Sequence, residues 1–196
     1  MKGNMSSVAE ERSAACAALL RQVRAIHTAE GIGEASLGKI KSLLVDFAVH
    51  GAALFPDDDF AMPYAHGLSH KLEVADNDGC GLYLTVNLPG KEAAPHAHGI
   101  WCVNAGLSGS EAHRFYRRTD DRRRAGHATL EEVGQAIVAP GAAMAMADHD
   151  IHSTVVTGER PARALALYGY ALDRFPSVVW FHPQFATCRT MPSRRA

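Results

Sequence analysis

Residues 81–109, GLYLTVNLPGKEAAPHAHGIWCVNAGLSG, combine two short apolar segments with a turn and a pair of histidines between them. The first segment, residues 81–88, contains β-branched and aromatic residues and ends at a Pro-Gly pair, as expected of a strand followed by a turn. His96 and His98 are separated by one residue, and side chains two positions apart on a strand point to the same face. The stretch therefore predicts a β structure in which two imidazoles converge.

Short segments of the same kind occur before, within and after this stretch, and Gly, Pro or Asp separate them. They are residues 70–75, 100–107, 111–117, 136–139, 151–157 and 164–172. Short strands with turn signals between them are typical of a sandwich or barrel. Residues 76–79 carry the Asp-Gly signal of a hairpin turn between the first two strands. We expect a mainly β fold.

The first third of the chain has a helical periodicity instead. Apolar residues recur at helical spacing from Val8 to Ile26, and Ser7 and Glu10 have the spacing of a capping box. A second helix, which Ser36 can cap, has one apolar face. This face consists of Leu37, Ile40, Leu43, Leu44, Phe47 and Ala48. We expect the two helices to pack on the barrel, because their apolar faces would otherwise contact water.

A chain of 196 residues suits one structural domain. We expect residues 1–69 to form a helical segment packed on the barrel and residues 70–180 to form the barrel itself. Residues 181–196 are expected to be a C-terminal tail.

The composition points to a small-molecule partner. The 20 basic and 21 acidic residues give a net charge of -1, so no overall field favours nucleic acid or an anionic membrane surface. Four cysteines without a CxxC pair argue against a disulfide framework or a cysteine-rich zinc module. Because no apolar run suits a signal peptide or a membrane span, we expect a cytoplasmic protein.

The histidine pair belongs to a wider pattern of glycines and histidines. The spacing is Gly90-x5-His96-x-His98-x3-Cys102-x6-Gly109 in the first stretch and Gly141-x10-His152 in the second. This pattern resembles the two signature motifs of the cupin superfamily. The resemblance implies a small jelly-roll barrel, also called a double-stranded β-helix, that holds a divalent metal between the two motifs.

The resemblance implies that His96, His98 and His152 are the metal ligands, and Cys102 stands where many cupins have a fourth ligand, a glutamate. That replacement, with Tyr168 followed by glycine on the last strand, is similar to the cysteine dioxygenase family. Its members are thiol dioxygenases in which three histidines hold iron(II) and a Cys–Tyr thioether can form. The implied substrates are a small thiol and O₂, the product is a sulfinate, and the implied catalytic residues are Cys102 and Tyr168.

The ligand set suits this chemistry. Three neutral imidazoles leave the full charge of an iron(II) ion, and an anionic thiolate is then a natural further ligand. Coordination lowers the pKa of the thiol. Three histidines also accept nickel, zinc or manganese, so the donor set alone does not select iron.

The chain departs from the family in two places. Ala164 and Ala166 stand where the family has the Ser and His of a Ser-x-His-x-Tyr relay, and residues 82–88 contain no arginine to bind a substrate carboxylate. We therefore expect a preference for thiols whose other end is apolar, aromatic or uncharged, with Tyr83 and Trp101 as candidate pocket walls. Three later arginines are alternative anion-binding residues. They are Arg114, Arg117 and Arg118.

Other interpretations of the same residues stay open. His149 is a possible outer group or alternative ligand, and Glu111 and His113 fit an extra ligand in a different cupin arrangement. Two other functions use the same three histidines. One is a non-catalytic metal-binding cupin that senses a small ligand, and the other is a cupin dioxygenase that acts on a non-thiol substrate.

Overall fold

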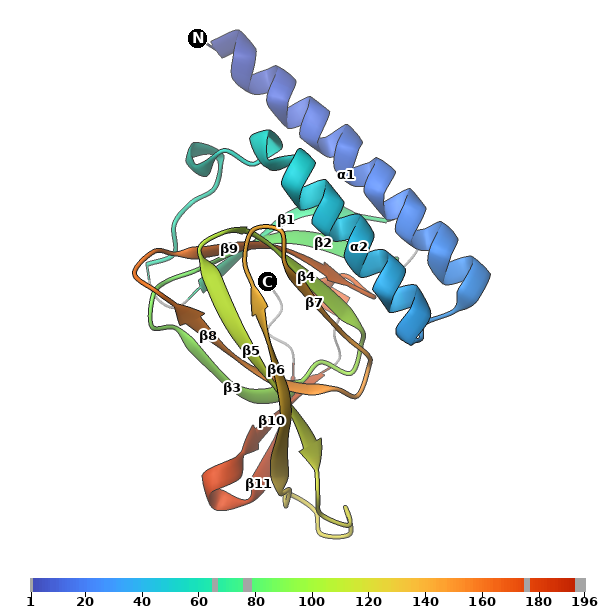
Figure 1. Ribbon diagram of the computed structural model, residues 1–196, viewed down its shortest axis with the longest axis vertical. Coiled ribbons are helices and arrows are strands. Elements are labelled where there is room, and N and C mark those ends of the chain that lie inside the picture. Colours follow the sequence, from blue (N-terminus) through green and yellow to red (C-terminus); the bar gives the residue numbers. More distant parts are fainter. Residues whose placement is uncertain (1, 65–66, 76–78, 175–176, 193–196) are drawn as a thin grey trace.

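A computed structural model describes residues 2–64, 67–75, 79–174 and 177–192. Within these residues two α-helices are followed by eleven strands in two antiparallel sheets (Figure 1). The helices are α1 (Lys2–Glu30) and α2 (Glu34–His50). The architecture confirms the predicted fold class, which is mainly β with a pair of N-terminal helices packed on the barrel.

The two sheets face each other and form the barrel. The smaller sheet has the order β1 (Gly67–Val74), β2 (Gly81–Asn87), β9 (Ala162–Tyr168), β4 (Cys102–Ser108) and β7 (Ala143–Met146). The larger sheet has the order β11 (Thr187–Pro192), β10 (Ser177–His182), β3 (Glu92–Ala97), β8 (Ile151–Thr157), β5 (Ser110–Arg118) and β6 (Leu130–Val138). β1 and β2 pair as the predicted hairpin, whose turn residues 76–78 lie outside the described residues.

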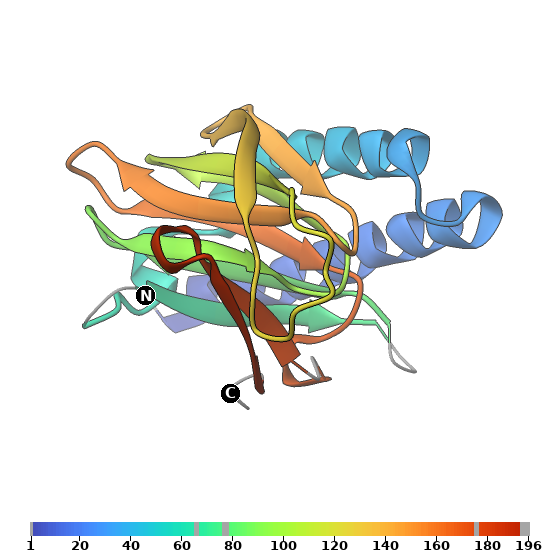
Figure 2. The same ribbon diagram turned by 90° about the horizontal axis from the view of Figure 1, so that it is seen from below.

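The helices lie side by side across the outer face of the smaller sheet (Figures 1 and 2). The outward-pointing side chains of the sheet meet the apolar helix faces in one buried cluster. From the sheet these are Leu82, Leu84, Val86, Val103, Ala105, Leu165 and Leu167. Because both faces of this sheet are covered, β2 and β9 are buried almost continuously and do not alternate in exposure.

The helix ends differ in detail from the prediction. α1 begins at Lys2, so Ser7 lies inside the helix and does not cap it. Gly31 ends α1 with φ of +68° and donates its N–H to the carbonyl of His27. Ser36 is at the third position of α2, where its hydroxyl accepts the N–H of the N-cap residue Gly33 at 2.9 Å. Neither α-helix has both the length and the apolar composition needed to cross a membrane, within the part of the chain described.

The C-terminal segment differs from the predicted tail of residues 181–196. β10 pairs with β11 and also with β3, so residues up to Pro192 extend the larger sheet. This hairpin lies at the end of the molecule away from the helices (Figure 1). The sequence SVVWFH at residues 177–182 is rich in β-branched and aromatic residues, and this composition favours a strand.

We predict that the packing of α2 on the sheet contributes strongly to stability. Leu44 is completely buried, so Leu44→Ala should lower the free energy of unfolding by about 2–5 kcal/mol in a urea titration. Val49 is on the same helix and 50% exposed, so Val49→Ala should change it by about 0.5 kcal/mol or less. Equal effects of the two substitutions would contradict this packing.

Candidate metal centre

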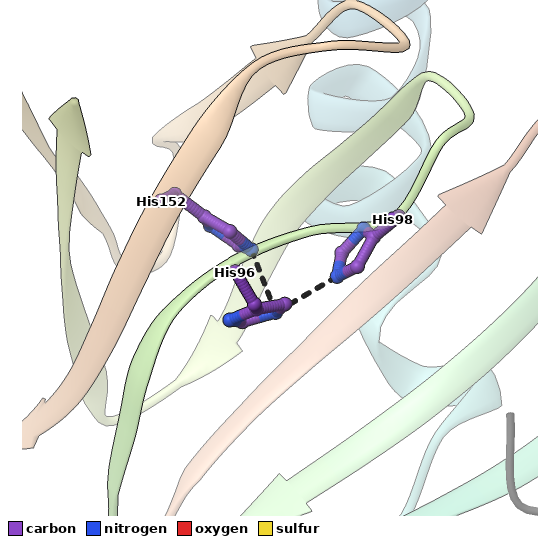
Figure 3. Close-up of side chains that lie close together, drawn as sticks. All are labelled: His96, His98 and His152. Carbon is purple, nitrogen blue, oxygen red and sulfur yellow. Dashed lines mark hydrogen bonds between the residues drawn. The ribbon is translucent and has the colours of Figure 1, made fainter. Parts of the chain in front are cut away.

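Strand pairing inside the larger sheet brings two of the three predicted ligands together. His96 on β3 is the direct cross-strand partner of His152 on β8. His98 lies just after the last residue of β3, so the two histidines of the motif do not share a regular strand as predicted. The three rings nevertheless point toward one another (Figure 3). The predicted ligand set is therefore assembled in space.

The ring nitrogens of the triad are close enough to share one ion. Nε2 of His96 lies 2.9 Å from Nε2 of His98 and 3.2 Å from Nε2 of His152. The candidate ligand atoms of all three lie within 4.8 Å of one another. Nδ1 of His96 lies 2.8 Å from the carbonyl oxygen of Ala94 and donates a hydrogen bond to it, which leaves the lone pair of the neutral ring on Nε2.

These distances fit a divalent metal. With metal–nitrogen bonds of about 2.0–2.1 Å, two ligand nitrogens lie about 2.9 Å apart at a right angle and about 3.4 Å apart at a tetrahedral angle. Both measured separations from His96 fall in this range. Lone pairs that face one another repel unless a proton or a cation lies between them. The residues present therefore suit a metal ion.

Burial keeps the triad neutral, as metal ligands must be. Burial lowers the pKa of His96 to about 4 and that of His98 to about 3, because it disfavours the charged imidazole. The neighbouring histidines add to this effect at His98. For His152 the pKa is well below its usual value for the same reason. Each ring is thus neutral at neutral pH, with a proton on one nitrogen and a lone pair on the other.

Of the two residues predicted to be catalytic, Tyr168 lies beside the triad and Cys102 lies beside Tyr168. Tyr168 on β9 is the direct cross-strand partner of Cys102 on β4, and its ring meets that of His98 at a centroid distance of 5.6 Å. Burial raises the pKa of Tyr168, and it raises the pKa of Cys102 to about 12, so both are protonated. Tyr168 thus adjoins a candidate ligand and Cys102 adjoins Tyr168, and their catalytic roles stay a prediction.

A cavity of about 390 Å³ opens beside the triad and is lined by residues of both sheets. Tyr168 and Asn104 line it from the smaller sheet. The amide oxygen of Asn104 is buried and has no hydrogen-bond partner among the described residues, so it is available to a bound molecule. No spacing pattern distinguishes this asparagine in the sequence.

Trp180 is a further site residue that the sequence analysis missed. It is the cross-strand partner of His96 from β10, and its ring stacks on the imidazole at 4.6 Å and 27°. Stacking of this kind fixes the plane of the ligand ring. The sequence of residues 177–182 indicates a strand. It does not indicate which strand this one pairs with, so it could not place Trp180 beside His96.

Several other residues that the sequence offered as candidates for the site lie away from the triad. His149 is on an exposed turn, and Trp101 belongs to the core under the helices. Arg117 pairs with Glu131, and Arg118 pairs with Asp120. None of the three alternative arginines lines the cavity beside the triad.

Glu111 and His113 lie next to the triad but do not join it. His113 on β5 is completely buried, and its Nδ1 lies 3.2 Å from Nδ1 of His152. Glu111 approaches the other side of the His113 ring, with Oε2 3.7 Å from Nε2. His113 therefore contacts His152 at the ring nitrogen that does not face His96, and both His113 and Glu111 line the cavity.

The chain is thus a barrel of two antiparallel sheets in which three imidazoles converge. Solved structures that resemble the chain at low identity include a protein described as a member of the cupin superfamily. KdgF from Halomonas sp. has a TM-score of 0.45 and 12% identity over 60% of this chain and 93% of its own. A cupin superfamily protein from Desulfitobacterium hafniense has a TM-score of 0.41 and 16% identity over 61% and 87%. Oxalate oxidase with glycolate has a TM-score of 0.43 and 13% identity over 64% of each chain. No family model matches the sequence, and neither does any curated protein.

We predict that the three histidines together bind about one divalent metal per chain. His96→Ala, His98→Ala and His152→Ala should each lose most of the metal and keep a folded barrel, because each removes one of three ligands. Metal analysis of the purified proteins measures this. His149→Ala is the control and should keep its metal, and full occupancy in His152→Ala would defeat the assignment.

We also predict a pH dependence of the metal-free protein. The pKa of an unfolded histidine is about 6.5, and that of folded His96 is about 4. Between these values the unfolded state binds a proton that the folded state does not, so stability falls as the pH falls. The slope is up to about 1.4 kcal/mol per pH unit for each such histidine. Urea unfolding with a chelator at about pH 7, 6 and 5 should give a smaller slope for His96→Gln than for wild type. The exposed control His50→Gln should keep the wild-type slope.

Proposed function

We propose that the protein is an iron(II)-dependent thiol dioxygenase that converts a small thiol and O₂ into a sulfinate. The observation that carries the proposal is the ligand set, three neutral imidazoles with no carboxylate among them. Such a set leaves the charge of a divalent cation uncompensated, and this favours an anionic sulfur ligand. The balanced reaction is RSH + O₂ → RSO₂H, in which both oxygen atoms become bonded to sulfur.

The metal would be held by His96, His98 and His152. When bound, iron(II) supplies a Lewis acid that lowers the pKa of a thiol and a redox centre that reacts with O₂. The fixed orientation of the His96 ring, through Ala94 and Trp180, holds one ligand nitrogen toward the cavity. A preorganised triad avoids the cost of arranging ligands on binding.

The chain provides a proton donor and a dry surface around this centre. Tyr168 keeps its phenolic proton because of its raised pKa, and it lies beside His98, so its Oη can donate to an oxygen atom of the reacting molecule. Cys102 is neutral and completely buried, and its face of the sheet adjoins apolar side chains that exclude water. These are Val138, Met144, Met146 and Ala164.

One observation favours a second candidate function. Ala164 and Ala166 share the inward face of β9 with Tyr168, and a methyl side chain has no group to relay a proton to the phenol. This arrangement favours a metal-binding cupin that senses a small ligand without turnover. A dioxygenase acting on a diketone or an aromatic diol is the third possibility, and the same measurement separates all three.

We predict that the iron-loaded protein takes up O₂ with small thiols and forms the sulfinate. An oxygen electrode measures the uptake, and mass spectrometry detects the two added oxygen atoms. A panel of thiols and a diketone identifies the substrate class, and iron-treated His152→Ala is the control. Uptake with none of the thiols above this control would end the thiol proposal, and uptake with the diketone alone would favour the third function.

We further predict weak selection for a substrate carboxylate. Among the residues that the structure describes, Lys91 is the one lysine or arginine that lines the cavity, and its ammonium already donates to Oδ1 of Asn87. A charge-assisted hydrogen bond contributes about 1.5–3 kcal/mol, or roughly 10–150-fold in turnover efficiency. Cysteine and 3-mercaptopropionate should therefore gain less than about a hundredfold over 2-mercaptoethanol in kcat/KM. A larger preference for cysteine would contradict this prediction.

A further inference from the structure

In the contact between His113 and His152, one ring must donate a hydrogen bond and the other must accept it. The two rings are stacked at a centroid distance of 5.3 Å, and the atoms that approach to 3.2 Å are both Nδ1. A hydrogen bond between two such nitrogens needs a proton on one and a lone pair on the other. A neutral imidazole carries its single proton on either Nδ1 or Nε2. The direction of this bond therefore fixes the tautomer of both rings.

Only one direction lets His152 bind a metal through Nε2. If His152 donates from Nδ1, its Nε2 has a lone pair, and this is the atom that faces His96 at 3.2 Å. If His113 donates instead, His152 must carry its proton on Nε2, where the proton blocks coordination. The site thus needs His113 to accept through Nδ1 and to hold its own proton on Nε2.

Glu111 favours the direction that the site needs. Its Oε2 lies 3.7 Å from Nε2 of His113, and both side chains are buried. A carboxylate attracts an N–H and repels a lone pair, so it stabilises the tautomer of His113 with the proton on Nε2. Nε2 of His113 has no hydrogen-bond partner among the described residues, so the carboxylate is the charge that this atom faces.

The carboxylate is in turn held by two more polar residues. Oε1 of Glu111 accepts a hydrogen bond from Nδ2 of Asn87 at 2.5 Å. Oδ1 of Asn87 accepts from the ammonium of Lys91. The ammonium of Lys91 and the carboxyl group of Glu111 are thus bridged by one amide side chain. Three residues, Asn87, Glu111 and His113, therefore connect Lys91 to the rear of His152.

We infer that Glu111 and His113 are positioning residues that fix His152 as the tautomer with its proton on Nδ1 and its metal-binding lone pair on Nε2. This inference deepens the proposed function and rests on a metal at the same site. It does not depend on which molecule is oxidised. Partners of this kind behind a ligand imidazole typically contribute about 10–100-fold in metal affinity.

The first experiment measures Zn²⁺ affinity at one neutral pH by competition with a chelator. His113→Leu removes the acceptor and should weaken binding by about 10–100-fold, whereas His113→Gln provides a carbonyl acceptor and should stay close to wild type. Glu111→Gln can turn an amide N–H toward His113, which favours the wrong tautomer, so it should also weaken binding. His149→Leu is the control and should have no effect. Circular dichroism and thermal unfolding of each metal-free variant identify any variant that fails to fold.

The second experiment reads the tautomer directly in the zinc-loaded protein. Long-range ¹H–¹⁵N correlation spectra should show His113 protonated on Nε2 and His152 protonated on Nδ1. A His113 proton on Nδ1, or Zn²⁺ affinity of His113→Leu equal to wild type, would overturn the inference. Equal losses in His113→Leu and His113→Gln would reduce His113 to a packing residue. If wild type binds no Zn²⁺, the metal site itself fails, whereas failure of thiol oxidation by a metal-binding protein affects only the proposed function.

Discussion

The burial of β9 on both of its faces is the constraint on which the rest of the structure depends. Leu165 and Leu167 point outward and are completely buried beneath the helices, where their apolar area is removed from water at about 25 cal/mol per Å². Ala164, Ala166 and Tyr168 point inward on the same strand. The two alanines leave room in the barrel, and the tyrosine occupies the end nearest the histidines. The helices therefore also stabilise the position of the strand that carries the candidate proton donor, Tyr168.

The barrel interior is asymmetric, and this asymmetry organises the site. The smaller sheet contributes mainly apolar or neutral groups to the interior, such as Cys102 and Met146. The larger sheet contributes the imidazoles and the buried carboxylate of Glu111. Polar groups in a medium of low dielectric are costly unless they have partners, and here they are connected in a chain from Lys91 to His152. The triad and Glu111 thus line the cavity from one side, and Asn87, Asn104 and Tyr168 of the smaller sheet line it from the other.

Burial acts on the different groups of the site in one direction, toward neutrality. It lowers the pKa of the histidines and raises the pKa of Cys102 and Tyr168. Neutral imidazoles can bind a metal, and a protonated phenol can donate a hydrogen bond. A single physical cause therefore prepares both the ligands and the candidate donor. A bound cation would also remove the repulsion among the three converging lone pairs, so metal affinity and the order of the site are coupled.

The sequence by itself determined the features that depend on local periodicity. The spacing of Leu37, Ile40 and Leu44 set the buried face of α2, because a helical period repeats within a few residues. The three converging histidines were instead implied by the resemblance of two sequence motifs to those of a known family. Only the tertiary structure decided which strands are neighbours. The pairing of β3 with β8 puts His96 opposite His152, and β10 adds Trp180. The register of β5 against β8 brings His113 behind His152, although the two are 39 residues apart in the chain. Such pairings depend on the packing of the whole barrel, and no period along the chain records them.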